Sequence, residues 1–476
     1  MRKLLLFLFA SVYVLSLRAE RIDLTTAQQV AENVMEGNAS LRSSGPEKLS
    51  LAYVAYSENG KSGLRNGAGQ GDADFYVFNA GNDAGFIIVA GENRVRPVLG
   101  YATKGHFDPI DVPDNMNIWL KHYQSEVKYA VEKNIRATVA VREEWDSLLR
   151  NSVGITSKVI LKTAEWGQDD PFNRKCPAIN GKQTMTGCVA TAQAIIMQYY
   201  QYPKRAVGGV SSYMNIPIVY DAYDWDNILP EYKEQRPGLS AYYTGYQADC
   251  MANLIWHCGA NVGMAYGVEE SSASLASCAV SLQNVFGYSK QVRYISKLSP
   301  AGSDAYSWTD WMNILRGELD NNRLVLYDGQ TEEMVDPFNG KGHAFVCDGY
   351  ADGDLFHINW GWEGYLNGYF LLTTLDPYGD NKGYSQRQGM IINIKPDDES
   401  ENVADLYLGQ SVQCAYLPFT INQPVIAYFT YANKGNIPFK GYANFVIVDG
   451  KDNSIKKFLQ EQNEPISVGI ESDQTV

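Results

Sequence analysis

A helix that begins at a cysteine is the feature that most limits how this chain can fold. Residues 186–197 follow a strong helical pattern, in which Thr186 or Gly187 can serve as the N-cap and Pro203 marks the end. Small residues after Cys188 leave room for a facing element to approach closely. We therefore expect a helix with Cys188 in its first turn.

The position of Cys188 suggests a reactive thiol. The unpaired N–H groups and the helix dipole at a first turn favour the thiolate over the thiol. The alternative is a buried cysteine that only packs the start of the helix, which is the usual fate of a free thiol. The flanking glycine and the helix start give a nucleophile about the same weight as this alternative, and such a nucleophile needs a base.

Five histidines are candidates for that base: His106, His122, His257, His343 and His357. The first two lie in an N-terminal stretch that we expect to be removed, as argued below. His257 follows a tryptophan inside an apolar helical run, so a core histidine with satisfied hydrogen bonds is the better interpretation. His343 and His357 remain.

Both remaining histidines lie in the run 342–362, which predicts two antiparallel strands joined by an Asp/Gly turn. The amide oxygen of Asn359 could accept the imidazole N–H of His343 and fix its tautomer, as in a catalytic triad. The simplest register opposes Asn359 to Val346, so a bulge or a strand end is needed to join the two. His357 shares the strand face of Asn359 and is a rival base, or else a cross-strand surface residue.

Gln168 is a candidate for the oxyanion hole. It lies in a loop 20 residues before Cys188. A side-chain amide beside the nucleophile's own N–H would stabilise the oxyanion of acyl transfer. A solvated loop glutamine is the commoner case, so Gln168 gains weight only from the order Gln–Cys–His–Asn along the chain.

The 476 residues suggest about three domains. Residues 20–150 predict a helix near 27–34, strands near 74–79, 85–90 and 98–101, and a helical stretch over 117–149. Residues 151–395 hold most of the tryptophans and all but one cysteine. Residues 400–476 follow an acidic linker and contain strand-like runs at 424–431 and 443–448. We expect a small β-sandwich-like module there, and the lack of a clear final strand suggests that it is truncated.

The ends of the chain and its charge narrow the function classes. Residues 1–19 have the basic start and short apolar core of a signal peptide, so export is expected, with no retained membrane span. The net charge of −14, without any Lys/Arg-rich run, argues against nucleic acid as a partner. The seven cysteines are odd in number and scattered, which argues against a disulfide framework.

No metal or other cofactor is expected. His343 and Cys347 are four residues apart and could suggest a zinc pair. On a strand, however, that spacing separates them by about 13 Å, and no companion ligand motif is visible.

Taken together, these motifs resemble the streptopain family of bacterial cysteine peptidases, within the papain-like group, and especially its interpain-type members. The matching segments follow one another in order over about residues 160–395: 166–168 (WGQ), 171–173 (PFN), 186–192 (TGCVATA), 264–267 (MAYG), 286–288 (FGY), 342–344 (GHA), 359–364 (NWGWEG) and 368–370 (GYF). The resemblance implies an α+β fold. We expect a papain-like catalytic domain at 151–395, with a helical part and an antiparallel β part.

The resemblance also implies site roles. Cys188 would be the nucleophile and Gln168 the oxyanion-hole donor, and His343 is favoured over His357 as general base and acid. Asn359 and Trp360 would orient and shield the imidazole. The substrate-binding residues implied in the same way are Gly187, Tyr266, Gly267, Ser272 and Gly342. The loop after residue 267 borders the specificity cleft in this family, and the paired Glu269 and Glu270 are unusual there.

Residues 77–107 resemble the family's prodomain, which makes 20–150 an α+β inhibitory prodomain rather than an independent binding domain. The expected protein is a secreted or surface-exposed bacterial cysteine endopeptidase, made as a zymogen and cut somewhere in 140–155, near Asn151. Its partners would be protein or peptide substrates and its own prodomain. The rival interpretations are a papain-fold amidase or transglutaminase-type enzyme and a non-enzymatic exported adhesin or inhibitor-like protein.

Overall fold

The computed structural model describes residues 21–37, 49–56, 72–81, 83–151, 154–233, 242–298, 305–330, 342–375 and 388–397, and six strands after residue 400. The expected signal peptide, residues 1–19, lies outside the described residues. Within the described part of the chain, no helix is long and apolar enough to cross a membrane.

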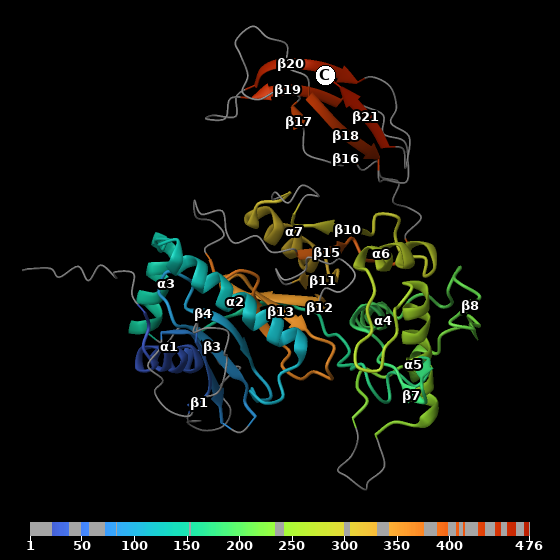
Figure 1. The fold of residues 1–476 in the computed structure, drawn as a ribbon, viewed down its shortest axis with the longest axis horizontal. Helices are drawn as coiled ribbons and strands as arrows, with labels where there is room; N and C mark the ends of the chain where they lie inside the picture. Colours follow the sequence, from blue (N-terminus) through green and yellow to red (C-terminus); the bar gives the residue numbers. More distant parts are fainter. Residues whose placement is uncertain are drawn as a thin grey trace, which may run out of the picture.

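The N-terminal part combines three helices with a four-stranded antiparallel meander (Figure 1). Its elements are α1 (Leu24–Gly37), β1 (Leu49–Tyr56), β2 (Ala73–Ala80), β3 (Phe86–Ala90), β4 (Val98–Ala102), α2 (Asp114–Glu132) and α3 (Val139–Arg150). The expected strands are confirmed within one or two residues. The expected helical stretch over 117–149 is confirmed, and it is divided into two helices, α2 and α3. Asn134 there takes the left-handed conformation, and the Thr138 side chain caps α3.

The helical half of the middle part is built around α4. Its elements are β6 (Ala178–Ile179), β7 (Lys182–Gln183), α4 (Cys188–Tyr200), β8 (Ser212–Tyr213), β9 (Ile216–Pro217), a 3-10 turn (Trp225–Asn227), α5 (Gly245–Asn261) and α6 (Leu275–Asn284). Residues 189–197 of α4 are all buried, because α5 and α6 pack on one side and the sheet on the other. The expected buried helix is therefore confirmed.

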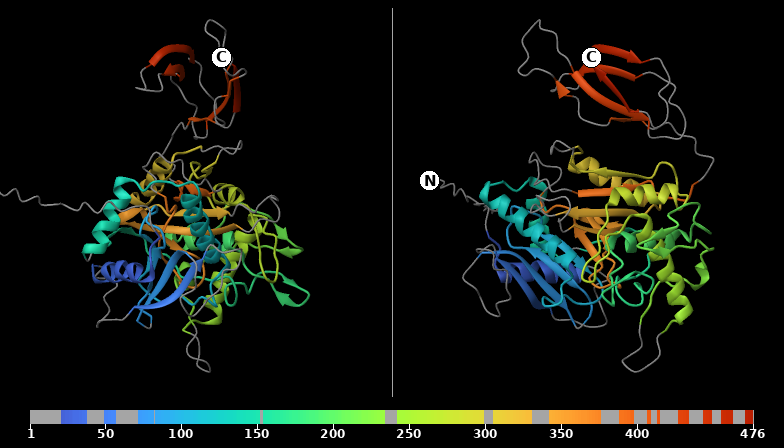
Figure 2. Two further views of the ribbon diagram at one scale, coloured as in Figure 1. Left: turned by 60° about the vertical axis from the view of Figure 1, so that its left-hand side comes forward. Right: turned by 45° about the vertical axis from the view of Figure 1, so that its right-hand side comes forward.

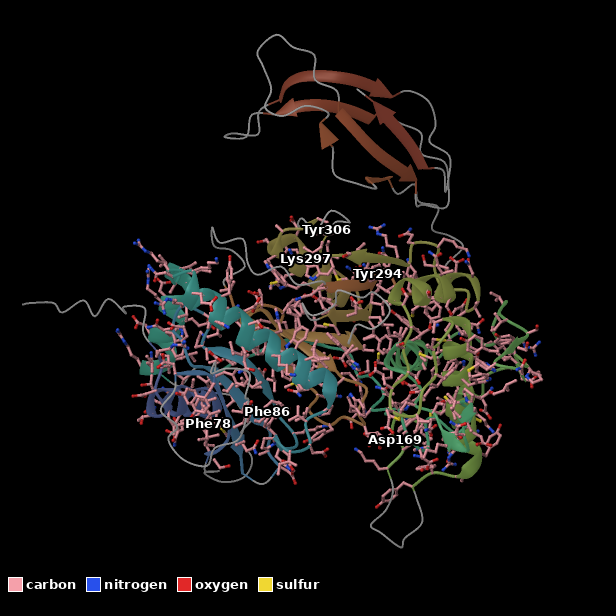
Figure 3. All side chains as sticks on the ribbon, in the orientation of Figure 1. Phe78, Phe86, Asp169, Tyr294, Lys297 and Tyr306 are labelled. Atoms are coloured by element: carbon pink, nitrogen blue, oxygen red, sulfur yellow. The ribbon has the colours of Figure 1, made fainter. Side chains whose placement is uncertain are left out.

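The β half of the middle part belongs to an 11-stranded sheet. Its elements are β5 (Ser157–Ile160), β10 (Arg293–Ser296), α7 (Trp308–Asp320), β11 (Val325–Gln330), β12 (Gly342–Ala351), β13 (Leu355–Asn359), β14 (Gly368–Leu371) and β15 (Gln388–Ile392). The sheet order is β1-β2-β3-β4-β14-β13-β12-β11-β15-β10, with β5 paired to β12. Figure 3 labels Phe78 on β2, next to one end of the sheet, and Tyr294 on β10, at the other end.

One antiparallel pairing, between β4 and β14, joins the N-terminal strands to the sheet of the middle part. Tyr101 pairs with Tyr369, and Gly100 pairs with Phe370. A Cβ on Gly100 would lie 2.6 Å from the Phe370 ring and 2.9 Å from the Tyr369 carbonyl oxygen. The close approach of these two strands therefore requires glycine at this position.

The C-terminal strands form sheets of their own, drawn in red in Figure 2. They are β16 (Leu406–Leu408), β17 (Gln413–Cys414), β18 (Ala427–Asn433), β19 (Ala443–Val448), β20 (Ile455–Gln462) and β21 (Glu471–Thr475). The expectation that no clear final strand exists is wrong, since β21 pairs with β18. The polar sequence of β21 lacks apolar alternation, so only its pairing partner reveals it as a strand.

Candidate functional site

Cys188 begins α4, and Gly187 rather than Thr186 is its N-cap. Gly187 has φ +84°, and a Cβ there would lie 2.6 Å from the Met264 sulfur. Both the backbone conformation and the close packing therefore require glycine before the nucleophile. The Thr186 hydroxyl instead forms a hydrogen bond with the Thr191 hydroxyl at 2.7 Å.

Cys188 lies against the strand that carries His343. Helix α4 packs on β12, and the backbone N–H of Ala344 donates a hydrogen bond to Cys188 Sγ, with 3.5 Å between nitrogen and sulfur. Two residues that are 156 positions apart in the sequence are thus in contact at the site. This contact places the residue next to His343 directly on the candidate nucleophile.

The imidazole of His343 is held by a main-chain carbonyl. Its Nε2 lies 3.0 Å from the carbonyl oxygen of Trp360. Because a carbonyl can only accept a hydrogen bond, we assign the proton to Nε2, which leaves Nδ1 as the basic nitrogen. The described structure has no hydrogen bond between His343 and Cys188, so the two groups are neighbours without being paired.

Burial keeps both groups uncharged. It raises the pKa of the Cys188 thiol above its ordinary value, although N–H groups of Ala344, Val189 and Cys188 oppose the shift. Burial lowers the pKa of the His343 imidazole to about 4, and the Trp360 carbonyl opposes that shift. At neutral pH the site therefore holds a thiol and a neutral imidazole rather than a thiolate–imidazolium pair.

Asn359 does not contact the imidazole. The expected register is confirmed, with Asn359 opposite Val346. The Asn359 amide nitrogen donates to Thr163 Oγ1 at 3.0 Å and to the Ala164 carbonyl at 2.8 Å, and its oxygen accepts from the N–H of Gly361 at 3.1 Å. The expected Asn359–His343 hydrogen bond is therefore absent here. The register leaves Asn359 three positions along the sheet from His343, and the Trp360 carbonyl takes its place.

Trp360 acts on His343 through its backbone. Its indole N–H donates to the Leu366 carbonyl at 3.0 Å, and its ring packs against Phe345 and Phe370, with ring centroids 5.0 and 5.3 Å away. The indole is thus part of the core, and the carbonyl is the atom that orients the imidazole. The role of Trp360 in orienting the imidazole stays a prediction, and the contact that would support it is made by the carbonyl rather than by the indole.

The segment that leads to Cys188 is bound by two loops. The carbonyl of Gln168 accepts the N–H of Thr186 at 3.0 Å, which fixes the loop of Gln168 beside the helix start. Figure 3 labels Asp169, the next residue. The carbonyl of Gly267 accepts the N–H of Met185 at 3.0 Å. The structure thus brings Gln168 and Gly267 to residues 185–186, which lead through Gly187 to Cys188.

The other expected substrate-binding residues, Tyr266, Ser272 and Gly342, differ in burial and position. Tyr266 is buried, and a Cβ on Gly259 of α5 would lie 2.0 Å from its hydroxyl oxygen, so the phenol is packed into the helical half. Ser272 is exposed and pairs with Ala265 in an isolated bridge. Gly342 is the first residue of β12 and pairs with Gln330. Ser272 is thus a surface residue and Gly342 a strand-end residue, whereas Tyr266 is a core residue. Their roles in substrate binding stay a prediction.

Two histidines that competed with His343 have other partners. His257 is buried in α5, with Nδ1 2.9 Å from the Tyr223 hydroxyl, and burial lowers its pKa to about 4. The interpretation as a core histidine is confirmed. His357 has Nδ1 2.5 Å from Asp348 Oδ1, so the structure gives it a carboxylate partner away from Cys188.

The six cysteines in the described part of the chain are all free, and four of them are buried: Cys176, Cys258, Cys278 and Cys347. The interpretation of most cysteines as small core residues is confirmed for these four. Cys414 lies outside this description.

Sequence reasoning missed one face of α2. Trp119 packs edge-on against Phe345 and Trp360, with ring centroids 5.6 and 5.8 Å away. Tyr123 donates its hydroxyl to the Leu371 carbonyl at 2.7 Å, and Glu126 accepts the Thr373 hydroxyl at 2.7 Å. These α2 residues are spaced four and three positions apart, which is the period of a helix face and was the available signal.

Comparisons with known proteins agree with this site. A sequence model of the peptidase C10 family matches residues 166–370, and one described as Spi protease inhibitor matches residues 19–127. Thiol protease/hemagglutinin PrtT of Porphyromonas gingivalis is 31% identical over 404 residues, which are 80% of this chain and 42% of that protein. This chain thus spans less than half the length of that relative.

Two further relatives cover more of their own length. Streptopain of Streptococcus pyogenes is 30% identical over 356 residues, which are 68% of this chain and 81% of streptopain. The solved structure of a prointerpain A fragment from Prevotella intermedia has a TM-score of 0.51 and 26% identity. The match covers 71% of this chain and 97% of that fragment. The similarity includes both the N-terminal part and the part that carries the site.

Proposed function

The chain belongs to the peptidase C10 family, the streptopain family of cysteine endopeptidases, and we propose that it is the precursor of an exported enzyme of this type. The observation that supports the proposal most directly is the contact of the Ala344 N–H with Cys188 Sγ, since Ala344 directly follows His343 in the chain. The proposed substrates are proteins and peptides. Export would follow from residues 1–19, and the mature enzyme would act outside a bacterial cell.

The proposed chemistry is acyl transfer. The Cys188 thiolate attacks a peptide carbonyl, while the Cys188 N–H and the Gln168 amide stabilise the oxyanion. Nδ1 of His343 first takes the proton of the Cys188 thiol and then gives it to the leaving amine as the C–N bond breaks and the thioester forms. It next takes a proton from the water that hydrolyses the thioester, and this proton returns to the Cys188 sulfur. The Nε2–H of His343 stays on the Trp360 carbonyl, which keeps Nδ1 directed to the reaction.

The N-terminal part would hold this chemistry idle as a prodomain. Trp119 of α2 packs on Phe345 of β12 and on Trp360, which directly follows β13. Both of these residues contact His343. The pairing of β4 with β14 attaches the same part along a sheet edge. Removal of residues 20–150 would expose the imidazole to water, raise its pKa toward the usual range, and permit the ion pair with Cys188.

The proposed cut lies in 140–155, near Asn151. Helix α3 ends at Arg150, and Asn151 is exposed. Strand β5 begins at Ser157 and pairs with β12, so a cut upstream of it leaves the catalytic sheet intact. Exposed backbone between two ordered elements is the usual site of proteolytic cleavage.

Self-processing is tested by incubating the purified precursor with a reductant beside the Cys188→Ala variant. We expect only the wild-type chain to lose its N-terminal part, because cleavage needs the thiol. Equal processing of both variants at high purity would contradict self-processing. Mass spectrometry of the product gives the mature N-terminus.

Reactivity of the thiol is the second test. Iodoacetamide should alkylate Cys188 of the precursor slowly at pH 6 and faster toward pH 9, because its pKa is raised and His343 is neutral. The processed enzyme should react rapidly already at pH 6. An epoxysuccinyl peptide should label only processed Cys188, and absence of that label in the processed form would contradict an active enzyme. Release of small peptides from casein separates an endopeptidase from an amidase or transglutaminase-type enzyme.

A further inference from the structure

The turn that presents the Trp360 carbonyl to His343 is closed by one side chain. Asn359 Oδ1 accepts the N–H of Gly361, two residues later, which is the arrangement of an Asx turn. Gly361 has φ +74°, a conformation that few other residues adopt. The direction of the Trp360 carbonyl therefore depends on the orientation of the Asn359 amide.

The orientation of the Asn359 amide is set by a hydrogen bond to Thr163. The Asn359 amide nitrogen donates to Thr163 Oγ1 at 3.0 Å, and the Thr163 hydroxyl lies 2.5 Å from Asp348 Oδ2. Since the Asp348 carboxylate only accepts, the hydroxyl hydrogen points to Asp348 and its lone pair faces Asn359. The carbonyl of Ala164 accepts the second amide hydrogen. Each donor in the chain thus has one allowed direction.

A β-bulge places Asp348 at this point. The pairing of β12 with β13 shifts between Cys347 and Gly349, so Asp348 is the extra residue. Its two carboxylate oxygens are divided between Thr163 and His357, with Oδ1 2.5 Å from His357 Nδ1. Asp348 is almost fully buried, so an uncompensated carboxylate there would be costly. The contact with His357 therefore holds the Asp348 carboxylate in the orientation in which it accepts the Thr163 hydroxyl.

We propose that Thr163, Asp348 and His357 are positioning residues, which act through Asn359 on the turn that orients His343. This proposal rests on the proposed function, because it assigns these residues to the same reaction. None of the three touches Cys188 or the imidazole of His343. Their effect is on the direction of the Trp360 carbonyl, and therefore on the direction of Nδ1 in the processed enzyme.

The deciding variant is Thr163→Val, which keeps the shape of the side chain and removes the hydroxyl. In the processed enzyme we expect kcat for a peptide substrate to fall by about tenfold to a hundredfold, with KM changed by less than about threefold. Thr163→Ser restores the hydroxyl and should recover most of kcat. Thr156→Val, the same change at an exposed threonine seven residues earlier, is the matched control and should leave kcat unchanged.

The readouts separate positioning from folding. Titration of Cys188 with an epoxysuccinyl peptide counts competent molecules, and kcat is expressed per labelled site. The pH dependence of Cys188 alkylation should shift upward in Thr163→Val, because the imidazolium is less well placed to stabilise the thiolate. If kcat per labelled site and the alkylation profile both equal those of the wild type, the proposal is wrong, even when fewer molecules fold.

Asp348→Asn provides a second test. An amide of the same shape cannot accept from both Thr163 and His357 as strongly as a carboxylate, so the same loss of kcat per labelled site is expected. A wild-type value for Asp348→Asn would overturn the assignment of Asp348. If the processed wild type neither labels nor cleaves peptides, the proposed function fails. If the wild type is active and Thr163→Val is equally active, the proposed positioning role is wrong but the proposed function stands.

Discussion

At the scale of single residues, His343 is oriented by a main-chain carbonyl where a side-chain amide was expected. Strand alternation and the hairpin turn predict that Asn359 lies opposite Val346, and the structure confirms this register. These patterns cannot tell whether the Asn359 amide contacts the imidazole itself or holds the turn from which the Trp360 carbonyl contacts it. The two arrangements differ by one residue along the same turn. The difference becomes visible only through Thr163, which comes from a segment 196 residues away.

Asp328 is a second residue with an unusual state near the nucleophile. It lies on β11 opposite Ala344, the residue that contacts Cys188. Its Oδ1 is buried without a hydrogen-bond partner, and burial raises its pKa to about 7, although the N–H of Gly389 opposes the shift. The folded chain therefore retains a proton between about pH 4 and pH 7 that the unfolded chain has lost.

This raised pKa predicts a pH-dependent gain in stability for Asp328→Asn. The wild type loses stability as pH rises from about 4 to 7, because unfolding then releases the buried proton, and above pH 7 it retains an unpaired buried charge. In the inactive Cys188→Ala precursor, Asp328→Asn should raise the melting temperature at pH 8 and change it little at pH 4.5. The exposed Asp226→Asn should show no such difference. An equal shift at both pH values would contradict the prediction.

At the scale of secondary-structure elements, α2 holds the N-terminal part on the catalytic sheet. Trp119, Tyr123 and Glu126 lie on one helix face and contact β12, β14 and the segment after β14, respectively. The contacts combine a buried indole with hydrogen bonds to the catalytic part. The helix itself could be predicted, but its partner could not, because the apolar and polar residues of this face are mixed.

Trp119→Ala should weaken the packing of α2 against Phe345 and Trp360. Truncation of a buried tryptophan costs about 3–5 kcal/mol, and here the loss falls on the contact between the two parts. We expect the precursor to convert to the processed form faster after addition of reductant, as followed by gel electrophoresis. The processed enzyme should have wild-type activity, because residue 119 is removed from it. Lys121→Ala, an exposed residue of the same helix, is the control, and a conversion rate equal to that of this control would contradict the prediction.

At the scale of the whole molecule, one sheet runs from β1 to β10 through both parts of the precursor (Figure 1). The junction is the pairing of β4 with β14, where the Tyr101 and Tyr369 rings stack with centroids 5.0 Å apart. Arg96 adds ion pairs to Asp354 and Glu144, each at 3.1 Å. Removal of the N-terminal part would turn β14 into an edge strand.

Gly100→Ala should weaken this junction. The added methyl group would meet the Phe370 ring and the Tyr369 carbonyl, and overpacking of this kind typically costs about 1–3 kcal/mol. We expect faster processing of the precursor and an unchanged processed enzyme. Gly317→Ala in α7, where no atom lies within 4 Å of the new Cβ, is the matched control. Processing at the wild-type rate would show that the junction does not limit release.

The residues left both His343 and His357 open as the base, and the family resemblance favoured His343. What the sequence by itself determined is most of the elements, the helix start at Cys188 and the hairpin register. These follow from local periodicity, capping and turn chemistry, which act over a few residues. Only the tertiary structure decided which group holds the imidazole, that Tyr266 is a core residue, that β21 exists, and that α2 lies over the site. Each depends on a contact between segments that are distant in the chain, and no local pattern encodes the partner of such a contact.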